Sequence, residues 1–186
     1  SEMCIRDRNL SGAYIAVFRS TPMMVQLYII FYGLFSVIKI PSVVILGFID
    51  LSRFIPGVVA LALNSSAYVA EIIRAGILAV DGGQNEAARS LGLSSWQSMK
   101  LVVLPQAIKN ILPALGNEMI TLLKDTSLVS VIALRDVTKQ AQNIVSNTYQ
   151  AYVPYVSLAI IYLVLVIILT KLLGIFERRL RESDRR

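Results

Sequence analysis

Residues 86–92 read Glu86-Ala87-Ala88-Arg89-Ser90-Leu91-Gly92, and after nine further residues the chain reads Val102-Val103-Leu104-Pro105. This segment is charged and rich in helix-forming residues, and it lies between long stretches of strongly apolar sequence. A polar segment that stays folded between apolar stretches indicates a loop that docks onto something soluble.

Composition places the chain among membrane proteins. Of its 186 residues, 55% are hydrophobic and only 16% are charged, and the mean hydropathy is +0.65. Residues 20–38, 54–70 and 140–170 contain no charge, and about 20 apolar residues suffice to cross the hydrocarbon core of a bilayer. Residues 101–123 are also long enough, although Lys109 and Glu118 would lead to their rejection on hydropathy alone. The sequence therefore predicts an all-α membrane protein, a helical bundle with four transmembrane helices.

Local signals set the expected bounds of these spans. Thr21 or Ser20 can cap a helix and Pro22 is tolerated in a first turn, so the first span starts near Pro22, or is kinked there and starts near Tyr14. Residues 40–53 are expected to form a loop. The later spans are expected near residues 54–70, 106–123 and 153–175.

The second span carries a stripe of small side chains, Ala62, Ser66 and Ala70, at four-residue spacing. Small residues let helix backbones approach closely in a bilayer, so this stripe is expected to pack against another helix. Glu71 and Arg74, three residues apart, are expected to form an ion pair. Hydrogen bonds between helices are expected from the polar residues of this span: Asn64, Ser65 and Tyr68.

The opening segment is predicted to be a bent pair of short helices. A turn at residues 81–83 leads into a helix over residues 84–91, which Gly92 ends. Ser94 and Gln97 have the spacing of a capping box, so a second helix starts near Ser95 and runs towards Leu104, where Pro105 bends it. Trp96 is expected to pack against the underside of this loop.

Charge distribution gives an orientation. The net charge is +6, from 18 Lys and Arg against 12 Asp and Glu. With the loop and the C-terminus inside, 13 of the 18 basic residues lie on the inner side, and the positive-inside rule then makes that side cytoplasmic. No basic-aromatic patch suggests nucleic acid. The outer side takes five basic residues: Lys39, Arg53, Lys124, Arg135 and Lys139.

Several kinds of chemistry are excluded by missing residues. The chain has no histidine and one cysteine, Cys4, so it offers neither a disulfide nor a Cys/His metal site of its own. No G-x-x-x-x-G-K-[ST] motif is present to hold ATP, and no G-x-S-x-G motif suggests a hydrolase. We expect no catalytic residue, no metal and no cofactor on this chain, and hence no enzyme.

Together with the loop, three further segments resemble permeases of polar amino-acid ABC importers. They read Phe18-Arg19-Ser20-Thr21-Pro22-Met23-Met24-Val25-Gln26-Leu27, Asn64-Ser65-Ser66-Ala67-Tyr68-Val69-Ala70-Glu71-Ile72-Ile73-Arg74-Ala75-Gly76 and Leu122-Leu123-Lys124-Asp125-Thr126-Ser127-Leu128. The loop resembles the cytoplasmic coupling loop of such permeases, and the likeness extends over residues 9–180. Ala75 stands where the family commonly has glycine.

The resemblance implies a MetI-like permease in the cytoplasmic (inner) membrane of a bacterium. Residues 9–182 are expected to form the permease domain, with the coupling loop at 81–105 and a cytoplasmic basic tail at 183–186. Because the family usually has five core helices, the first is expected to be missing, and residues 1–8 are expected to be a gene-model artefact. The implied partners are an ABC ATPase subunit, a second permease subunit, identical or not, and an extracytoplasmic amino-acid-binding protein.

For the coupling loop, the resemblance implies a docking element that contacts the ATPase. It is expected to consist of Glu86, Ala87, Ala88 and Gly92, together with Leu104 and Pro105. The alternative is a solvated helix in which Glu86 pairs with Arg89, an interaction worth about 0.2–0.5 kcal/mol.

For the substrate, an amino acid needs a cation for its carboxylate and acceptors for its ammonium group. Lys124 and Asp125 supply both signs, unless they form a structural pair at the interface. Glu118, with Asn117 beside it, lies further inward and could reach a basic side chain of the substrate. The alternatives to an importer subunit are a passive or ion-coupled channel or carrier, or a membrane scaffold.

Overall fold

The computed structural model describes residues 2–47 and 49–182, so the expected basic tail at 183–186 lies outside the described residues. Among these residues the fold is almost wholly helical. The elements in chain order are α1 (Glu2–Ser20), α2 (Met23–Tyr28), the π-helical η1 (Ile29–Leu34), α3 (Phe35–Val37), β1 (Val44–Ile45), β2 (Ile49–Asp50), α4 (Leu51–Leu78), α5 (Gly82–Ser90), α6 (Ser95–Ser98), the π-helical η2 (Met99–Val103), α7 (Leu104–Asp125), the 3-10 helix η3 (Thr126–Ile132), α8 (Val137–Thr148) and α9 (Tyr152–Glu182).

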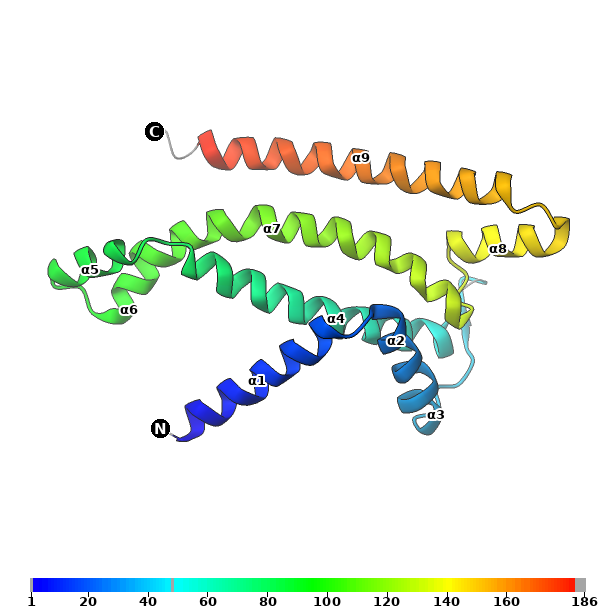
Figure 1. Ribbon diagram of the computed structural model, residues 1–186, viewed down its shortest axis with the longest axis horizontal. Coiled ribbons are helices and arrows are strands. Elements are labelled where there is room, and N and C mark those ends of the chain that lie inside the picture. The colour runs from blue at the N-terminus through cyan, green and yellow to red at the C-terminus, as the bar shows by residue number, and fades with distance from the viewer. Residues whose placement is uncertain (1, 48, 183–186) are drawn as a thin grey trace.

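The long helices α4, α7 and α9 lie side by side along the longest axis of the molecule (Figure 1). The short helices α5 and α6 lie at one end of this layer, and α8 lies at the other. The start of α1 and the end of α9 lie towards the same end as α5 and α6 (Figure 1).

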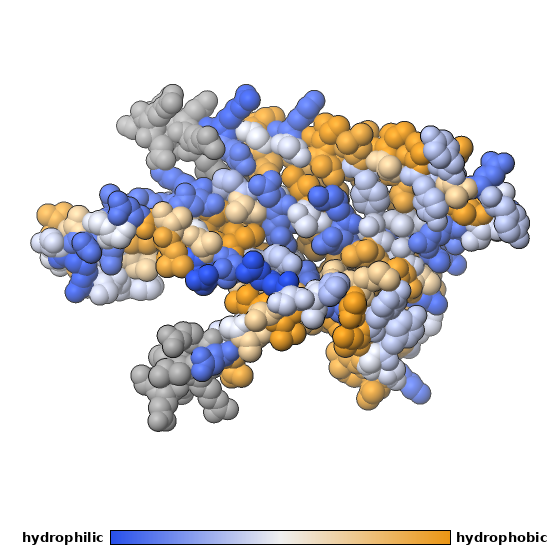
Figure 2. Space-filling model, in the orientation of Figure 1, coloured by the Kyte–Doolittle hydropathy of each residue, from blue (hydrophilic) through white to orange (hydrophobic). Residues whose placement is uncertain are grey.

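Two of the described helices, α4 and α9, are each long and apolar enough to cross a bilayer. A third span results if α1 and the helical segment Met23–Val37, which meet at an angle of 107°, are counted together. The kink expected at Pro22 is thus a full break in the helix. Apolar side chains cover much of the visible face of α9 (Figure 2), as lipid contact requires.

Helix α4 begins at Leu51, three residues earlier than Phe54, where the sequence indicated its start. The Asp50 side chain caps it by accepting a hydrogen bond from the Ser52 backbone N–H at 3.0 Å. Arg53 pairs with the same carboxylate at 2.7 Å. The segment before α4, expected to be a plain loop, contains the antiparallel hairpin β1–β2, which pairs Val44 with Asp50.

The small residues buried on α4 are not those of the predicted stripe, and one of them, Gly76, allows α7 to approach closely. Ala60, Ala67 and Gly76 are buried, whereas Ala62 and Ser66 lie on the exposed side of the helix. At Gly76 the approach is so close that an added Cβ atom would lie 2.3 Å from Cγ1 of Ile111 on α7. In a bilayer such backbone proximity is a main source of helix association, so α4 and α7 form a tightly packed pair.

Candidate functional site

The break between α1 and α2 positions one wall of the site. Pro22 has no N–H, so the carbonyl of Phe18, four residues earlier, loses its helical partner. Gln26, which is buried, supplies the replacement: its Nε2 donates to Phe18 O at 2.8 Å, to Thr21 O at 2.9 Å and to Thr21 Oγ1 at 2.7 Å. Irregular backbone at membrane depth is tolerated only where its polar groups find such partners.

Helix α4 holds this break in place. The buried Asn64 donates from Nδ2 to Oε1 of Gln26 at 2.9 Å. One helical turn away, the Tyr14 hydroxyl of α1 donates to Leu63 O at 2.7 Å and lies 2.5 Å from the Ser66 hydroxyl. Ser66, predicted to pack against another helix, therefore contacts α1 through a hydrogen bond.

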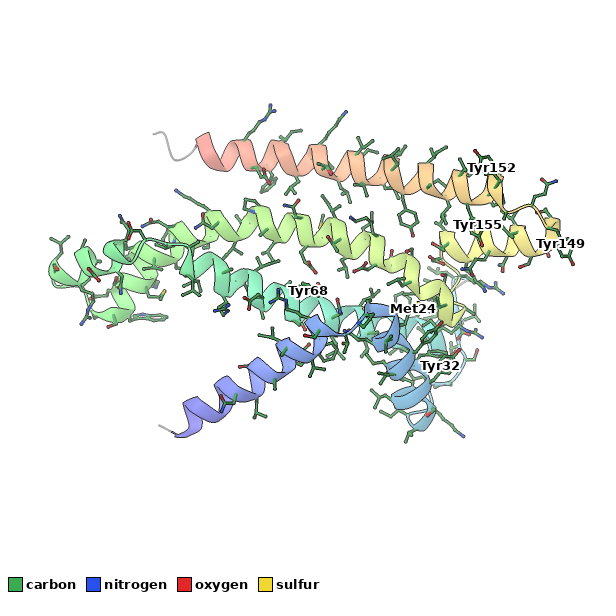
Figure 3. The ribbon with its side chains drawn as sticks, viewed as in Figure 1. Met24, Tyr32, Tyr68, Tyr149, Tyr152 and Tyr155 are labelled. Carbon is green, nitrogen blue, oxygen red and sulfur yellow. The ribbon has the colours of Figure 1, made fainter. Side chains whose placement is uncertain are left out.

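A polar cavity of about 350 Å³ lies beside the break. Three helices line it: the α1–α2 junction contributes residues 19–23, α4 contributes Asn64 and Tyr68, and α7 contributes Glu118, Thr121 and Asp125. Figure 3 shows Tyr68 on α4, close to the place where α1 crosses that helix. The volume lies within the range of about 300–1,000 Å³ that is usual for pockets that bind small molecules.

The cavity carries both signs of charge. Glu118 and Asp125 are seven residues apart on α7 and therefore lie on one face of the helix, about two turns from each other. Ser65 of α4 donates to Oε1 of Glu118 at 3.3 Å. Arg19 reaches the cavity from the end of α1, over the ring of Tyr68 and 3.8 Å from Glu71. An amphoteric molecule thus finds one basic and two acidic side chains in the described walls.

The structure brings together only part of the predicted substrate set. Glu118 and Asp125 line the cavity, whereas Asn117 and Lys124, each one residue earlier, are exposed and lie outside its lining. One residue on a helix is a rotation of about 100°, so neighbouring residues point in different directions. Sequence reasoning missed Arg19 and Thr121, and for Asn64 and Tyr68 it favoured hydrogen bonds between helices over contact with a ligand. The spacing 118, 121, 125 was the signal that could have identified this face of α7.

The second site is the short-helix tip formed by α5, α6 and η2. Helix α5 starts at Gly82, two residues earlier than predicted, because Asp81 Oδ1 caps it by accepting from Gly83 N at 2.8 Å. It ends at Ser90, one residue earlier than predicted, and Gly92 terminates it as predicted, with a φ of +88°. Leu93 N donates to Ala88 O and Gly92 N donates to Arg89 O, which is the Schellman arrangement.

The predicted capping box of α6 is also confirmed. Gln97 N donates to the Ser94 hydroxyl at 3.3 Å, and Ser94 N donates to Gln97 Oε1 at 2.8 Å. Pro105 lies in the first turn of α7, directly after the π-helical η2. The tip is therefore a folded unit with both of its short helices capped.

The interior of the tip differs from the prediction in two places. Ala88 is only 4% exposed and lies inside the tip, where Ser98 donates to Asn85 Oδ1 at 2.6 Å. Trp96 is not packed beneath the loop, because it is 72% exposed. Helix α6 is only one turn long. Ser98 is its buried residue, and the indole ring of Trp96 lies on its outer face.

The outer surface of the tip combines one free acid with apolar groups. Glu86 does not pair with Arg89, whose Nη1 donates instead to Leu93 O at 3.3 Å. The Glu86 side chain has no hydrogen bond or ion pair with any residue that the structure describes. Ala87 and Gly92 are exposed beside it, Leu91 is 85% exposed, and Leu104 and Pro105 are exposed at the start of α7. Figure 2 shows apolar and polar side chains intermixed at this end of the molecule.

Comparison with known proteins shows the same architecture elsewhere. A family described as the inner membrane component of binding-protein-dependent transport systems matches residues 6–182. The arginine transport system permease protein ArtQ of Bacillus subtilis is 47% identical over 175 residues, which cover 94% of this chain and 76% of ArtQ. The putative glutamine transport system permease protein GlnP of Rickettsia bellii is 40% identical over 173 residues, covering 93% and 75%.

A crystal structure of an amino acid ABC transporter with histidines superposes with a TM-score of 0.80 at 54% identity, covering 90% of this chain and 74% of the other. The fold is that of a membrane-embedded helical transport subunit. The chain belongs to the family of binding-protein-dependent transport system inner membrane components, the permeases of ABC importers. This confirms the resemblance stated from the sequence. The family's members are non-catalytic membrane subunits that work with a separate ATPase and a substrate-binding protein, so an inner-membrane location follows.

Proposed function

We propose that this chain is the permease subunit that imports cationic amino acids. The observation that carries the proposal is the charge of the cavity: two carboxylates, Glu118 and Asp125, face one guanidinium, Arg19. The lining thus carries one more negative charge than positive charge, which complements the net positive charge of arginine, lysine or protonated histidine. Two of the similar proteins, named for arginine transport and described with histidines, support the same class.

The partial burial of Glu118 and Asp125 makes this charge match selective. A charged group inside a membrane protein is costly unless it is paired, so a cavity with an uncompensated carboxylate favours a cationic side chain over a neutral one. Glutamine and cystine permeases are also among the relatives, and a neutral substrate is therefore the competing outcome of the test.

In the proposed assembly, four spans cross the membrane: the bent α1–α3 segment, α4, α7 and α9. The 13-to-5 distribution of basic residues supports a cytoplasmic position for the tip and for the C-terminus. The start of α1, the tip and the end of α9 share one end of the molecule, which agrees with that orientation (Figure 1). This chain lines the cavity, and a second permease subunit, identical or different, completes the transport pathway across the membrane.

The tip is proposed to be the site where the ATPase docks. Its exposed residues include Glu86, Ala87, Leu91, Gly92 and Trp96, and the capped helices make it rigid. The tip also connects α4 and α7, which form two walls of the cavity, because α4 leads into α5 and η2 leads into α7. A displacement of the tip is therefore transmitted to Glu118 and Tyr68 through a closely packed helix pair, as alternating access requires.

Uptake into proteoliposomes tests the proposal. The chain is reconstituted with an ABC ATPase subunit and an external binding protein of its transport system, and labelled arginine is offered with ATP inside. We expect uptake that needs both ATP and the ATPase, and that excess lysine or histidine inhibits more strongly than glutamine. Uptake in vesicles that lack the ATPase would show a channel or carrier, and stronger inhibition by glutamine would reject the cationic substrate class.

A further inference from the structure

Arg19 is the one basic side chain among the described residues that line the cavity. We infer that Arg19 binds the α-carboxylate of the transported amino acid, an inference that rests on the proposed import of amino acids through this cavity. Lys124, the cation that the sequence indicated for this task, is exposed and outside the lining.

The present contacts of Arg19 leave its donors free. Its Nη1 lies 3.8 Å from Glu71 Oε2, which is beyond hydrogen-bond distance. Glu71 is already engaged by Arg74, which donates to both of its oxygens at 3.0 and 2.6 Å. Arg19 donates no hydrogen bond to any described residue, although a guanidinium offers five N–H donors.

Tyr68 holds the guanidinium without using those donors. The Cζ atom of Arg19 lies over the Tyr68 ring, 5.5 Å from its centroid. A cation–π contact of this kind uses none of the N–H donors of the guanidinium, so they stay available for a carboxylate, which a guanidinium can bind through two hydrogen bonds. Arg19 is thus positioned in the cavity wall, and 42% of its side chain is exposed.

The distribution of charge then orients the substrate. The acidic groups come from α7, at Glu118 and Asp125, and the basic group comes from the end of α1. An amino acid that places its carboxylate on Arg19 directs its ammonium group and its cationic side chain to the α7 face. A carboxylate that entered this cavity without a cation would remain unpaired at membrane depth, which is costly.

Pairs of ligands that differ only in the carboxylate test the inference. Binding of arginine and of agmatine, which is arginine without its carboxylate, is measured by competition on the permease–ATPase complex. We expect the wild type to prefer arginine. Arg19→Gln should weaken arginine binding about 10- to 100-fold, the usual effect of losing charge-assisted hydrogen bonds, while agmatine binding stays unchanged or improves. The arginine affinity of Arg19→Lys should lie between those of the wild type and Arg19→Gln, because lysine keeps the charge and loses the paired donors.

Arg74→Gln is the matched control, because Arg74 binds the same Glu71 and does not line the cavity. It should leave the preference for arginine over agmatine intact. Equal effects of Arg19→Gln on arginine and agmatine, or no effect on either, overturn the inference. Glutamine and 4-aminobutanamide, which is glutamine without its carboxylate, are measured in parallel to separate the two claims. If only neutral substrates bind, the cationic substrate class fails. A preference for glutamine over 4-aminobutanamide that Arg19→Gln abolishes still upholds the role of Arg19. Binding of no amino acid at all would overturn both.

Discussion

Gly76→Ala tests the close packing of α4 on α7. The new Cβ atom would lie 2.3 Å from Cγ1 and 3.2 Å from Cδ1 of Ile111, and 3.5 Å from Ala107 O. Non-bonded carbon atoms pack at about 3.5–4.0 Å, so the helices must separate or Ile111 must leave its rotamer. Strain of this kind costs about 1–3 kcal/mol in a packed core.

Thermal unfolding of the permease–ATPase complex in nanodiscs measures this cost, with proteoliposome uptake measured in parallel. We expect a lower midpoint and reduced uptake for Gly76→Ala. Gly174→Ala on α9 is the control, because a Cβ atom there would meet nothing within 4 Å. Ile111→Ala combined with Gly76→Ala should recover part of the loss, with a coupling energy of about 0.5–3 kcal/mol. The reasoning is refuted if Gly76→Ala behaves like Gly174→Ala, or if the second substitution brings no recovery.

Three other substitutions probe the break, the tip and the start of α4. Gln26→Leu removes the donor to Phe18 O and Thr21 O, leaves Phe18 O only the long bond from Asn64 at 3.4 Å, and should destabilise the fold by about 1–3 kcal/mol; an unchanged unfolding midpoint would contradict this role. Trp96→Ala should lower ATPase co-purification while the unfolding midpoint stays the same, and undiminished co-purification would remove the indole from the proposed contact. The hydrogen bond from the Ser52 hydroxyl lowers the pKa of Asp50, so its stabilisation is present at neutral pH and lost as the pH falls through that lowered value; the unfolding midpoints of wild type and Asp50→Asn should converge in acid, and a constant difference would argue against it.

The sequence predicted the features that depend on local spacing. Gly92 ends α5 with a positive φ, and Ser94 with Gln97 forms the capping box, because both devices involve residues at most a few positions apart. The break at Pro22 and the Glu71–Arg74 pair were predictable for the same reason. Overall helicity and membrane class followed from composition.

The direction in which each helix face points was not predictable, because tertiary neighbours determine it. A four-residue repeat shows that Ala62, Ser66 and Ala70 share a face, but it does not show which face meets α7. The same uncertainty placed Trp96 inside the tip and Lys124 rather than Arg19 in the cavity. Arg19 lies at the break where α1 meets the Met23–Val37 segment at 107°, and Asn64 of α4 hydrogen-bonds to this break from a distant part of the sequence.

The hairpin before α4 was missed for a different reason. Leu46 has a φ of +54°, in the left-handed region that non-glycine residues seldom adopt, and only Gly47 beside it signals a turn. The strands are two residues long, which is too short for alternation to be recognised.

The charge of the cavity is the central claim, and arginine binding to matched variants of the permease–ATPase complex tests it most directly. Glu118→Gln and Asp125→Asn remove the two carboxylates, and Asn117→Ala and Lys124→Ala change their exposed neighbours. We expect each carboxylate substitution to weaken arginine binding about 10-fold or more, with little change in the two neighbours. Equal arginine affinity in all four variants, or loss only in Lys124→Ala, would contradict the account.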